Sequence, residues 1–262
     1  MGMLKSILEK TIFGRKSFQS FFSKLYVVAI KGMNYGGGAN CDSSGELFAI
    51  QYISSKLGKD LIIFDVGANI GEYSKSLKDI FGNRAIVHCF EPSDVSMNKL
   101  KDLLKTETGV VTVAKGLSDA EGKLELYADS ATSGLASVYQ RNLEHYHIPM
   151  NVIQQIDLTT VDLYCEKNQI QKIDFLKLDV EGHELKVLNG AKRMIESGNI
   201  RFIQFEFGGC DIDSKTFFQD FYYLLKDRYH IYRIVRDGLV PIKQYSEHLE
   251  IFSTINFLAE RK

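Results

Sequence analysis

The sequence predicts an α/β fold built on a mostly parallel sheet, and three observations support this class. Short apolar runs rich in β-branched residues recur along the chain, as in 61–66, 85–90 and 201–207. Each of them is typical of a strand buried on both faces. Segments with apolar residues at helical spacing follow these runs. The first strand leads through glycines straight into its helix, which is the opening unit of a doubly wound sheet.

The turn after the first strand gives the first indication of a ligand. From Asp65 to Gly71 it reads D-x-G-x-N-x-G, and a helix is predicted over 73–80. A dinucleotide fingerprint, G-x-G-x-x-G, would place glycines where Asn69 and Glu72 stand. A carboxylate at the strand end can instead meet an ammonium group, while the turn amides meet a carboxylate. The motif therefore favours a ligand with an amino-acid moiety, of which S-adenosylmethionine is the common cofactor.

Length and composition restrict the class of protein. The 262 residues suit one large domain, or one domain with an N-terminal extension. With 45% hydrophobic residues and a net charge of −1, the chain has enough apolar residues for a core and no electrostatic argument for a nucleic-acid partner. The four cysteines form no C-x-x-C pair, which predicts reduced thiols. No apolar run approaches the roughly 18 residues of a membrane span, and no signal-peptide core is recognisable, so we expect a cytoplasmic protein.

The segment 1–32 is basic and amphipathic. It carries six Lys or Arg residues against Glu9 alone, and Leu, Ile and Phe recur in it at roughly helical spacing. Such a helix can lie on an anionic membrane surface. Alternatively, its apolar face packs on its own domain or on a second subunit in a homo-oligomer. The sequence leaves these interpretations open.

We divide the chain into a helical N-terminal extension, 1–58, and an S-adenosylmethionine-binding domain, 59–262. The extension contains the glycine-rich connector 33–38 and a helix that begins at Glu46. This connector is either a flexible link or a lid over the pocket, from which Tyr35 or Glu46 would reach the ligand.

The second and third strands offer further ligand contacts. Glu91 stands at the tip of the second strand, where an acid can accept hydrogen bonds from both hydroxyl groups of a ribose. The third strand, 110–114, leads into the loop 116–122. Asp119 in this loop is placed to accept from the exocyclic amine of adenine, although a plain turn explains this residue nearly as well.

An antiparallel excursion is expected after the third strand. Residues 123–128 alternate between apolar and polar, as in an exposed strand, and we pair them with 152–156. The polar loop 129–149 lies between the two strands. Long connections without structure signals are often binding loops, so we expect this one to shape the acceptor site. His145 and His147 lack metal-ligand spacing with the other histidines, which makes a zinc site improbable.

The fourth strand delivers the densest group of polar residues. Asp179, Glu181, His183 and Glu184 follow it, and Glu206 ends the fifth strand. In open α/β sheets, ligands bind beyond the carboxyl ends of the strands, at the switch point between the two halves. The first and fourth strands flank that point, so we expect these groups beside the glycine turn.

Four segments together form a recognisable pattern. They are F-D-V-G-A-N-I-G (64–71), F-E-P-S (90–93), G-L-S-D-A-E-G (116–122) and L-D-V-E-G-H-E-L-K-V-L-N-G-A (178–191). This set resembles the FkbM-type methyltransferases, and the resemblance covers residues from about 33 to 258. It implies the Rossmann-like class I methyltransferase fold, with a seven-stranded sheet whose last hairpin is antiparallel. It also implies S-adenosylmethionine as the methyl donor and O-methylation of a hydroxyl group, on a sugar, a glycan or a polyketide-like product.

By position, the resemblance implies cofactor contacts at Asp65, Gly67, Asn69, Gly71, Glu91 and Asp119, and we expect Ala68, Pro92, Ser118 and Asp179 to join them. Asp179, Glu181 and His183 fall in the family's motif after the fourth strand. With Glu206, which ends the fifth strand at the same rim, they form the candidate catalytic set. In this set His183 is the candidate base because its unperturbed pKa lies near neutrality, while Asp179 or Glu206 could orient it or serve instead. Clustered carboxylates could also hold Mg²⁺, but we favour a site without a metal.

Two other function classes stay open at this stage. One is a catalytically inactive nucleotide-binding protein of the same fold, which the intact Asp65, Glu91 and Asp179 disfavour. The other is a dinucleotide-dependent oxidoreductase, which the glycine spacing disfavours. The expected partner is a small-molecule or glycan acceptor whose identity the sequence does not reveal.

Overall fold

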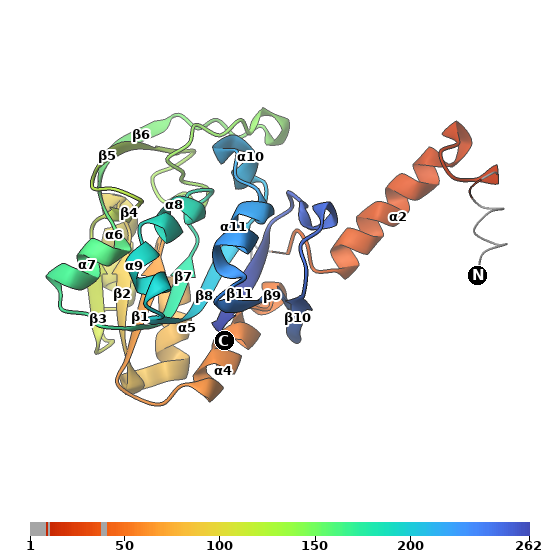
Figure 1. Cartoon of the computed structure of the whole chain (residues 1–262). Helices are drawn as coiled ribbons and strands as arrows, with labels where there is room; N and C mark the ends of the chain where they lie inside the picture. The colour runs from red at the N-terminus through yellow and green to blue at the C-terminus, as the bar shows by residue number, and fades with distance from the viewer. Residues whose placement is uncertain (1–8, 10, 38–40) are drawn as a thin grey trace.

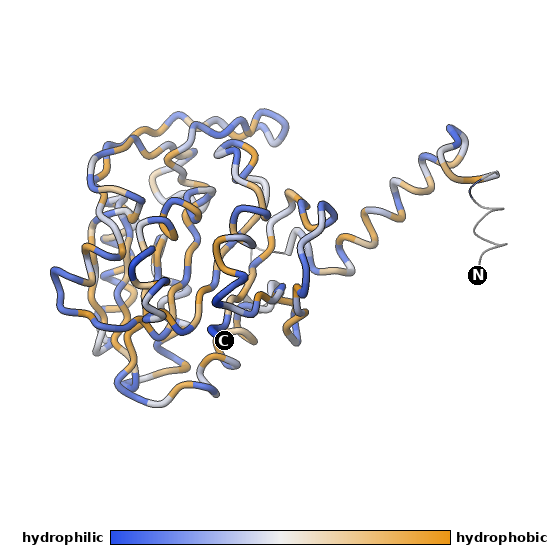
Figure 2. Tube along the Cα trace, viewed as in Figure 1, coloured by the Kyte–Doolittle hydropathy of each residue, from blue (hydrophilic) through white to orange (hydrophobic). Residues whose placement is uncertain are grey.

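The protein consists of an α/β body and a helical arm that projects from it (Figure 1). This computed structural model describes residue 9, residues 11–37 and residues 41–262. Helices cover both faces of the central sheet of the body, and α2 (Gln19–Gly32) forms most of the arm. Hydrophobic residues concentrate in the strands of the body, and they also recur along α2 (Figure 2).

The central sheet has eight strands in the order β10-β9-β11-β8-β7-β1-β2-β3. In chain order they are β1 (Leu61–Val66), β2 (Ala85–Phe90), β3 (Val110–Val113), β7 (Ile173–Leu178), β8 (Ile200–Phe207), β9 (Tyr229–Val235), β10 (Gly238–Ile242) and β11 (Ile255–Arg261). β3, β2, β1, β7 and β8 run parallel, whereas β11, β9 and β10 pair antiparallel. The strand order reverses between β1 and β7, so the switch point lies at their carboxyl ends.

The predicted α/β class and the antiparallel end of the sheet are confirmed, but the expected number of seven strands is wrong. β10 is an eighth strand that pairs with β9 beyond the turn at Asp237. Pro241 lies in β10, and proline argues against a strand because it has no N–H to donate. Because β10 is the edge strand, it has a neighbouring strand on one side only, and a proline that donates no hydrogen bond is tolerated there. The last strand also begins at Ile255 rather than at Phe252.

Three strands form a second, smaller sheet in the order β4-β6-β5. They are β4 (Gly116–Leu117), β5 (Gly122–Ala128) and β6 (Val152–Thr159). β5 and β6 pair antiparallel along their length, which confirms the predicted excursion. α7 (Val161–Lys167) follows β6 without having been predicted, and the Thr160 hydroxyl caps it by accepting from the Leu163 amide.

The two faces of the central sheet bury separate sets of side chains, because successive strand residues point to opposite faces. Ile63 and Phe175 pack with α4 (Glu46–Lys56) and α5 (Glu72–Phe81) on one face. Phe64 and Leu176 pack with α8 (Glu184–Asn189) and α11 (Phe218–Leu225) on the other. The helices of the body are α3 (Cys41–Ser44), α4 (Glu46–Lys56), α5 (Glu72–Phe81), α6 (Asp94–Leu103), α7, α8 (Glu184–Asn189), α9 (Lys192–Glu196), α10 (Cys210–Ser214) and α11 (Phe218–Leu225). These two cores hold the carboxyl ends of the parallel strands in fixed positions.

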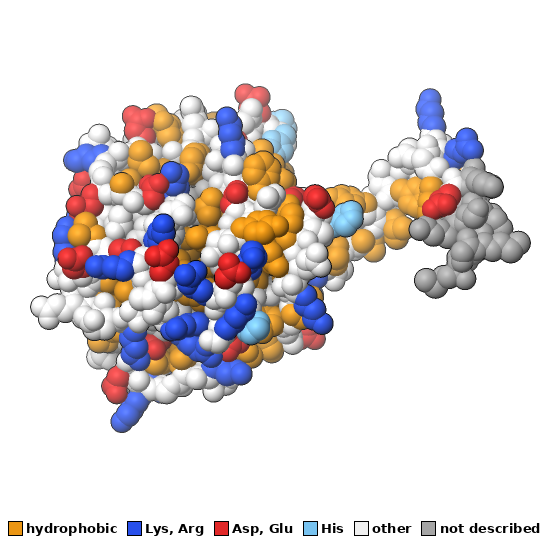
Figure 3. All heavy atoms as spheres, viewed as in Figure 1, with side chains coloured by type: hydrophobic (Ala, Val, Ile, Leu, Met, Phe, Trp, Pro, Cys, Tyr) orange, Lys and Arg blue, Asp and Glu red, His pale blue; other side chains and the backbone are white. Residues whose placement is uncertain are grey.

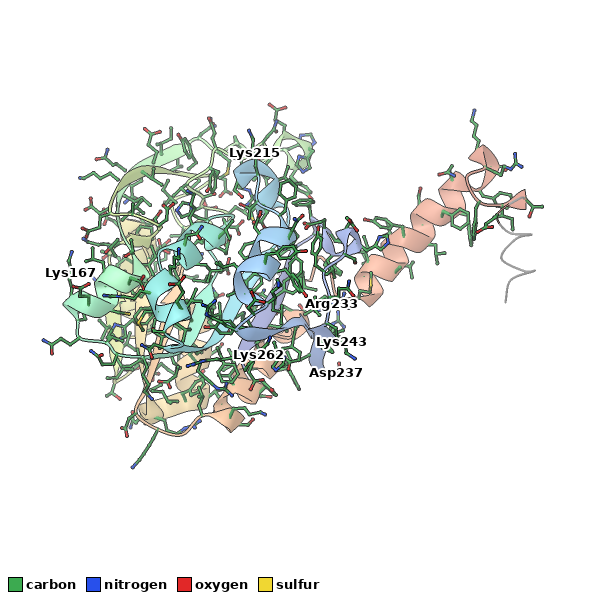
Figure 4. All side chains as sticks on the ribbon, viewed as in Figure 1. Lys167, Lys215, Arg233, Asp237, Lys243 and Lys262 are labelled. Carbon is green, nitrogen blue, oxygen red and sulfur yellow. The ribbon has the colours of Figure 1, made fainter. Side chains whose placement is uncertain are left out.

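The arm and the connector after it differ in how they meet the body. No residue of α2 is buried, whereas Tyr35 in the connector is buried and stacks against Arg233 of β9, which Figure 4 labels. Glu46 is also buried, and it accepts a hydrogen bond from Gln204 rather than facing the cavity. Residues 38–40 of the predicted lid lie outside the described part of the chain, and the domain division at residue 58 stays a prediction. Among the residues that the structure describes, no helix has the length and apolar character needed to cross a membrane.

Candidate active site

A cavity of about 800 Å³ opens at the carboxyl ends of the central strands. Its walls come from the turn after β1, the ends of β2, β7 and β8, the small sheet, and much of the loop between β5 and β6. The predicted site residues that line it are Gly67, Asn69, Glu91, Pro92, Asp179, Glu181, His183 and Glu206. The predicted residues Asp65, Ala68, Gly71, Ser118 and Asp119 do not.

The turn after β1 is fixed by glycine geometry and by hydrogen bonds to β2. The amides of Gly67 and Ala68 both donate to the Phe90 carbonyl at 3.0 Å. Gly67 has a φ of +79°, and a Cβ there would lie 1.8 Å from the Asp179 carbonyl oxygen. Gly71 has a φ of +93° directly before α5. Both positions therefore require glycine because their backbone is left-handed, and Gly67 also requires it because the turn approaches the residue after β7 so closely.

Glu91 joins this turn to the end of β2. Its carboxylate accepts from the Asn69 amide at 2.9 Å and from the Ser93 amide at 2.7 Å. Burial raises the pKa of Glu91 to about 7, although these two amides oppose the shift. A carboxylate has about four lone-pair sites, so two remain for a ligand in the cavity. This placement is compatible with the predicted contact to a ribose.

Asp65 is placed differently from the prediction that it meets an ammonium group of the ligand. It is fully buried in β1, where it accepts from the Ser74 hydroxyl of α5 and lies 3.5 Å from the Lys177 ammonium. Lys177 also contacts Asp179 at 3.2 Å. Burial alone lowers the pKa of Lys177, but the charges of Asp179 and Asp65 outweigh burial and raise it. Asp65 therefore acts through Lys177, which holds Asp179 at the cavity wall.

The predicted adenine contact at Asp119 is likewise not supported by its position. Asp119 forms an ion pair with Lys186 at 2.7 Å near the surface, and this hydrogen bond lowers the pKa of Asp119. Ser118 is buried behind the cavity wall and donates to Asp119 at 3.1 Å. Both residues belong to a hydrogen-bond chain that ends at His183, rather than to the cavity surface.

The acidic residues after β7 do come together, as predicted. Glu181 has a φ of +51° and Gly182 a φ of +99°, so the chain turns sharply after the strand. Glu184 holds this turn, because its carboxylate accepts from the Val180 amide at 2.7 Å and the Gly182 amide at 2.9 Å. Glu184 is therefore a structural residue, whereas Glu181 is left at the cavity wall.

Glu206 is the least satisfied of these carboxylates. Its exposed fraction is 7%, and within the described part of the chain its side chain accepts no hydrogen bond and forms no ion pair. Burial raises the pKa of Glu206 well above its usual value, and the negative charges of Asp179, Glu181 and Glu184 add to the shift. Burial also raises the pKa of Glu181, to about 8, against the opposing effect of Arg141. Such a strained cluster is typical of a functional site.

His183, the candidate base, has both ring nitrogens engaged. Nε2 lies 2.9 Å from the Ser118 hydroxyl, and Nδ1 lies 3.0 Å from the Tyr139 hydroxyl. Because Ser118 donates to Asp119, the fitting tautomer carries its proton on Nε2 and accepts from Tyr139 at Nδ1. Burial lowers the pKa of His183 to about 4, so the ring is neutral and weakly basic. This geometry suits a positioning role better than direct proton removal.

The loop between β5 and β6 closes the far side of the cavity. The Ser137 hydroxyl donates to the Glu181 carbonyl at 2.7 Å, and Arg141 forms an ion pair with Glu181. The sequence predicts an acceptor site at this loop, but it does not indicate the contacts that Tyr139, Arg141 and Lys177 make. No local motif marks Tyr139 and Arg141, because their partners His183 and Glu181 lie about 40 residues further along the chain. Lys177 contacts Asp179 two residues on, but its second partner, Asp65, lies on another strand.

A metal was not expected, and one group in the described part of the chain has suitable spacing. Candidate ligand atoms of Glu181, Glu206 and Cys210 all lie within 4.8 Å of one another. Arg141 already neutralises Glu181, and a thiol is a poor ligand for the oxygen-preferring Mg²⁺. These residues do not fit a magnesium site.

Comparison with known proteins identifies the family. A model of the FkbM methyltransferase domain matches residues 65–234, more than half of the chain. A curated relative, the hexuronic acid methyltransferase AglP of Haloferax volcanii, is 27% identical over 169 residues. The match spans 64% of this chain and 65% of that relative, a little less than two thirds of its length.

Solved structures with a similar fold include SMU.1697c, a putative methyltransferase from Streptococcus mutans in complex with SAH, with a TM-score of 0.45 and 11% identity. That likeness covers 83% of this chain and 98% of the other. The fibrillarin pre-rRNA processing protein of Methanococcus jannaschii has a TM-score of 0.46 and 14% identity, over 85% of this chain and 76% of its own. Scores this low carry no argument about the reaction. The family match over residues 65–234 decides the assignment, and the chain belongs to the FkbM family of S-adenosylmethionine-dependent methyltransferases.

Proposed function

We propose that this enzyme transfers a methyl group from S-adenosylmethionine to a hydroxyl oxygen of a sugar, within a glycan or a glycan precursor. The name of the relative AglP, a hexuronic acid methyltransferase, supports the acceptor class. The observation that carries the choice of a hydroxyl is Glu206, a buried carboxylate at the cavity wall to which no residue in the described part of the chain donates a hydrogen bond. An alcohol needs a proton acceptor as it attacks, and the Glu206 carboxylate has unused acceptor sites that can take this proton.

The residues at the β1 end of the cavity fit the cofactor. Gly67 lines the cavity at the turn, and its lack of a side chain lets the turn lie directly against the Asp179 carbonyl after β7. Glu91 has lone pairs left for two ribose hydroxyl groups, and Asp179 is held at the wall by Lys177. When bound, the cofactor supplies an electrophilic methyl group on a sulfonium sulfur. This chain binds it, aligns the acceptor and removes one proton.

Glu206 accepts the hydroxyl proton as the new oxygen–carbon bond forms and the sulfur–carbon bond breaks, with the bonding pair left on sulfur. A base works best when its pKa lies near the working pH. The raised pKa of Glu206 makes its carboxylate a stronger base than the imidazole of His183, whose pKa burial lowers to about 4. His183 instead orients the Tyr139 hydroxyl and, through it, the loop that covers the acceptor.

The test uses cofactor labelled with ¹³C in its methyl group and a panel of uronic-acid-containing and neutral oligosaccharides. We expect an alkali-stable methyl ether on a sugar hydroxyl in the NMR spectrum of the product, and its loss with Glu206→Gln. A methyl ester that mild alkali removes would contradict the proposal, because a carboxylate acceptor needs no base. Absence of transfer to every sugar, with transfer to another acceptor class, would also contradict it.

A further inference from the structure

The arm presents an apolar surface that nothing in the described chain covers. Figure 1 shows α2 extending away from the body, and Figure 3 shows hydrophobic side chains along it. No residue of α2 is buried, and Phe21 and Val28 are 60% and 66% exposed. Near its end, Ile30 alone packs against the core of the body. The alternative that the apolar face packs on its own domain is therefore wrong for these residues.

This surface has the geometry of one helical face. Phe21, Leu25 and Val28 stand at i, i+4 and i+7, so they form one stripe along the helix. Lys24 and Lys31 are also seven residues apart and form a second stripe beside it. Lysine stems can cover apolar surface while their ammonium groups reach outward, as at a membrane interface.

The charge of this region is of one sign. Between residues 10 and 41 the sequence has five Lys or Arg residues and no Asp or Glu. Two copies paired through α2 would bring the same lysines together, and neither helix contains an acid to neutralise them. An anionic lipid surface offers both apolar depth and negative charge. Charge complementarity thus favours lipid over a second copy.

We propose that α2 is a docking helix for an anionic lipid bilayer, with the stripe of Phe21, Leu25 and Val28 in the interface and Lys24 and Lys31 at the headgroups. The connector after α2 is held firmly, because the Gly36 amide donates to the Thr254 carbonyl at 2.8 Å. Both of these residues line the cavity. The arm is therefore joined to the body at the rim of the cavity.

The test is flotation of the full-length protein with vesicles of phosphatidylcholine alone or of equal parts phosphatidylcholine and phosphatidylglycerol. We expect binding to the anionic vesicles that salt weakens. Lys24→Glu with Lys31→Glu should lower the partition coefficient roughly 10–100-fold, since each basic residue near the surface contributes appreciably. Phe21→Ser with Val28→Ser should lower it at least roughly tenfold by removing buried apolar area.

A matched control carries the same charge change on the body. Lys123→Glu with Lys192→Glu alters two side chains that are 62% and 71% exposed, and it should bind vesicles like the wild type. The melting temperature of both arm variants should stay unchanged, because none of the substituted side chains is buried. The proposal is overturned if the wild type ignores anionic vesicles, or if the control loses as much binding as the arm variants. A dimer in light scattering that Phe21→Ser with Val28→Ser dissolves, without vesicle binding, would assign the arm to a second copy.

Discussion

At one end of the cavity, the Glu91 carboxylate accepts hydrogen bonds from backbone amides of the turn after β1 and of Ser93. At the other end Glu181 and Glu206 face the cavity, and among the described residues Arg141 is the cation that forms an ion pair with Glu181, whereas Glu206 forms none. The first end is fixed before a ligand arrives. The second end holds carboxylates close together with little solvent around them. Burial and the neighbouring negative charges disfavour their charged forms and therefore raise the pKa values of Glu181 and Glu206.

This difference separates two tasks. A binding surface gains from groups that are already held in place, because ordering them on binding would cost free energy. A proton acceptor gains from an environment that makes its carboxylate more basic than usual. The contrast predicts that substitutions at the β1 end affect cofactor affinity, whereas substitutions at the acidic end affect the rate.

The largest effect should follow from Gly67→Ala. The added Cβ would meet the Asp179 carbonyl at 1.8 Å, and alanine tolerates a φ of +79° poorly. We expect no measurable binding of S-adenosylhomocysteine in calorimetry. Gly58→Ala is the matched control, because no atom lies within 4 Å of a Cβ there and it should bind normally. Normal binding by the Gly67 variant would show that the turn does not contact the cofactor.

Glu206→Gln should lower the single-turnover rate by roughly 10²–10⁴-fold, as expected for loss of a general base. The amide keeps the shape of the side chain, so the melting temperature should not fall. His183→Gln should cause a smaller loss, because His183 acts on Tyr139 rather than on the acceptor. A larger loss for His183→Gln than for Glu206→Gln would return the role of base to the histidine.

The smallest predicted effect is on stability. Burial raises the pKa of Glu91 and Asp211 to about 7 and of Glu181 to about 8, so the folded state binds more protons than the unfolded state. The free energy of unfolding should therefore fall by roughly 1–3 kcal/mol as the pH rises from about 6.5 to 8. Below about pH 6.5 the buried neutral histidines have the opposite effect on the free energy of unfolding, because they bind fewer protons in the folded state than in the unfolded state.

Chemical denaturation at several pH values measures this slope. Glu181→Gln should flatten it, whereas Glu166→Gln, at a side chain 64% exposed, should leave it unchanged. A protein that becomes more stable between pH 6.5 and 8 would contradict the description of the acidic end.

The β1 end was largely predictable because its residues follow one another in the sequence. The glycine spacing and Glu91 lie at strand tips, where topology alone brings them together. The pairing of Asp65 was not predicted, because strand alternation does not reveal that Lys177, its register partner on β7, is buried with it. The chain around Asp65 showed a carboxylate at a strand end but not the cation that neutralises it.

At the acidic end, the sequence predicted which carboxylates lie at the cavity but not which side chains they and His183 contact. Glu181 and Glu206 were expected at the switch point, but the ion pair with Arg141 and the contact of Tyr139 with His183 bridge about 40 residues. Neither contact has a local signature. The eighth strand was missed for a similar reason, since the edge position that tolerates Pro241 is a property of the whole sheet.

The division between the two ends is tested most directly by calorimetric titration of S-adenosylhomocysteine into the wild type, Glu91→Ala and Glu206→Gln. Loss of the Glu91 carboxylate removes charge-assisted hydrogen bonds of about 1.5–3 kcal/mol each, so the Kd of Glu91→Ala should rise at least roughly tenfold. The Kd of Glu206→Gln should stay within about threefold of the wild type, a difference of less than 1 kcal/mol. The reason is that Glu206 belongs to the acidic end of the cavity, which we assign to the acceptor. Equal losses in the two variants, or a weaker Kd for Glu206→Gln alone, would contradict the separation of cofactor binding from proton removal.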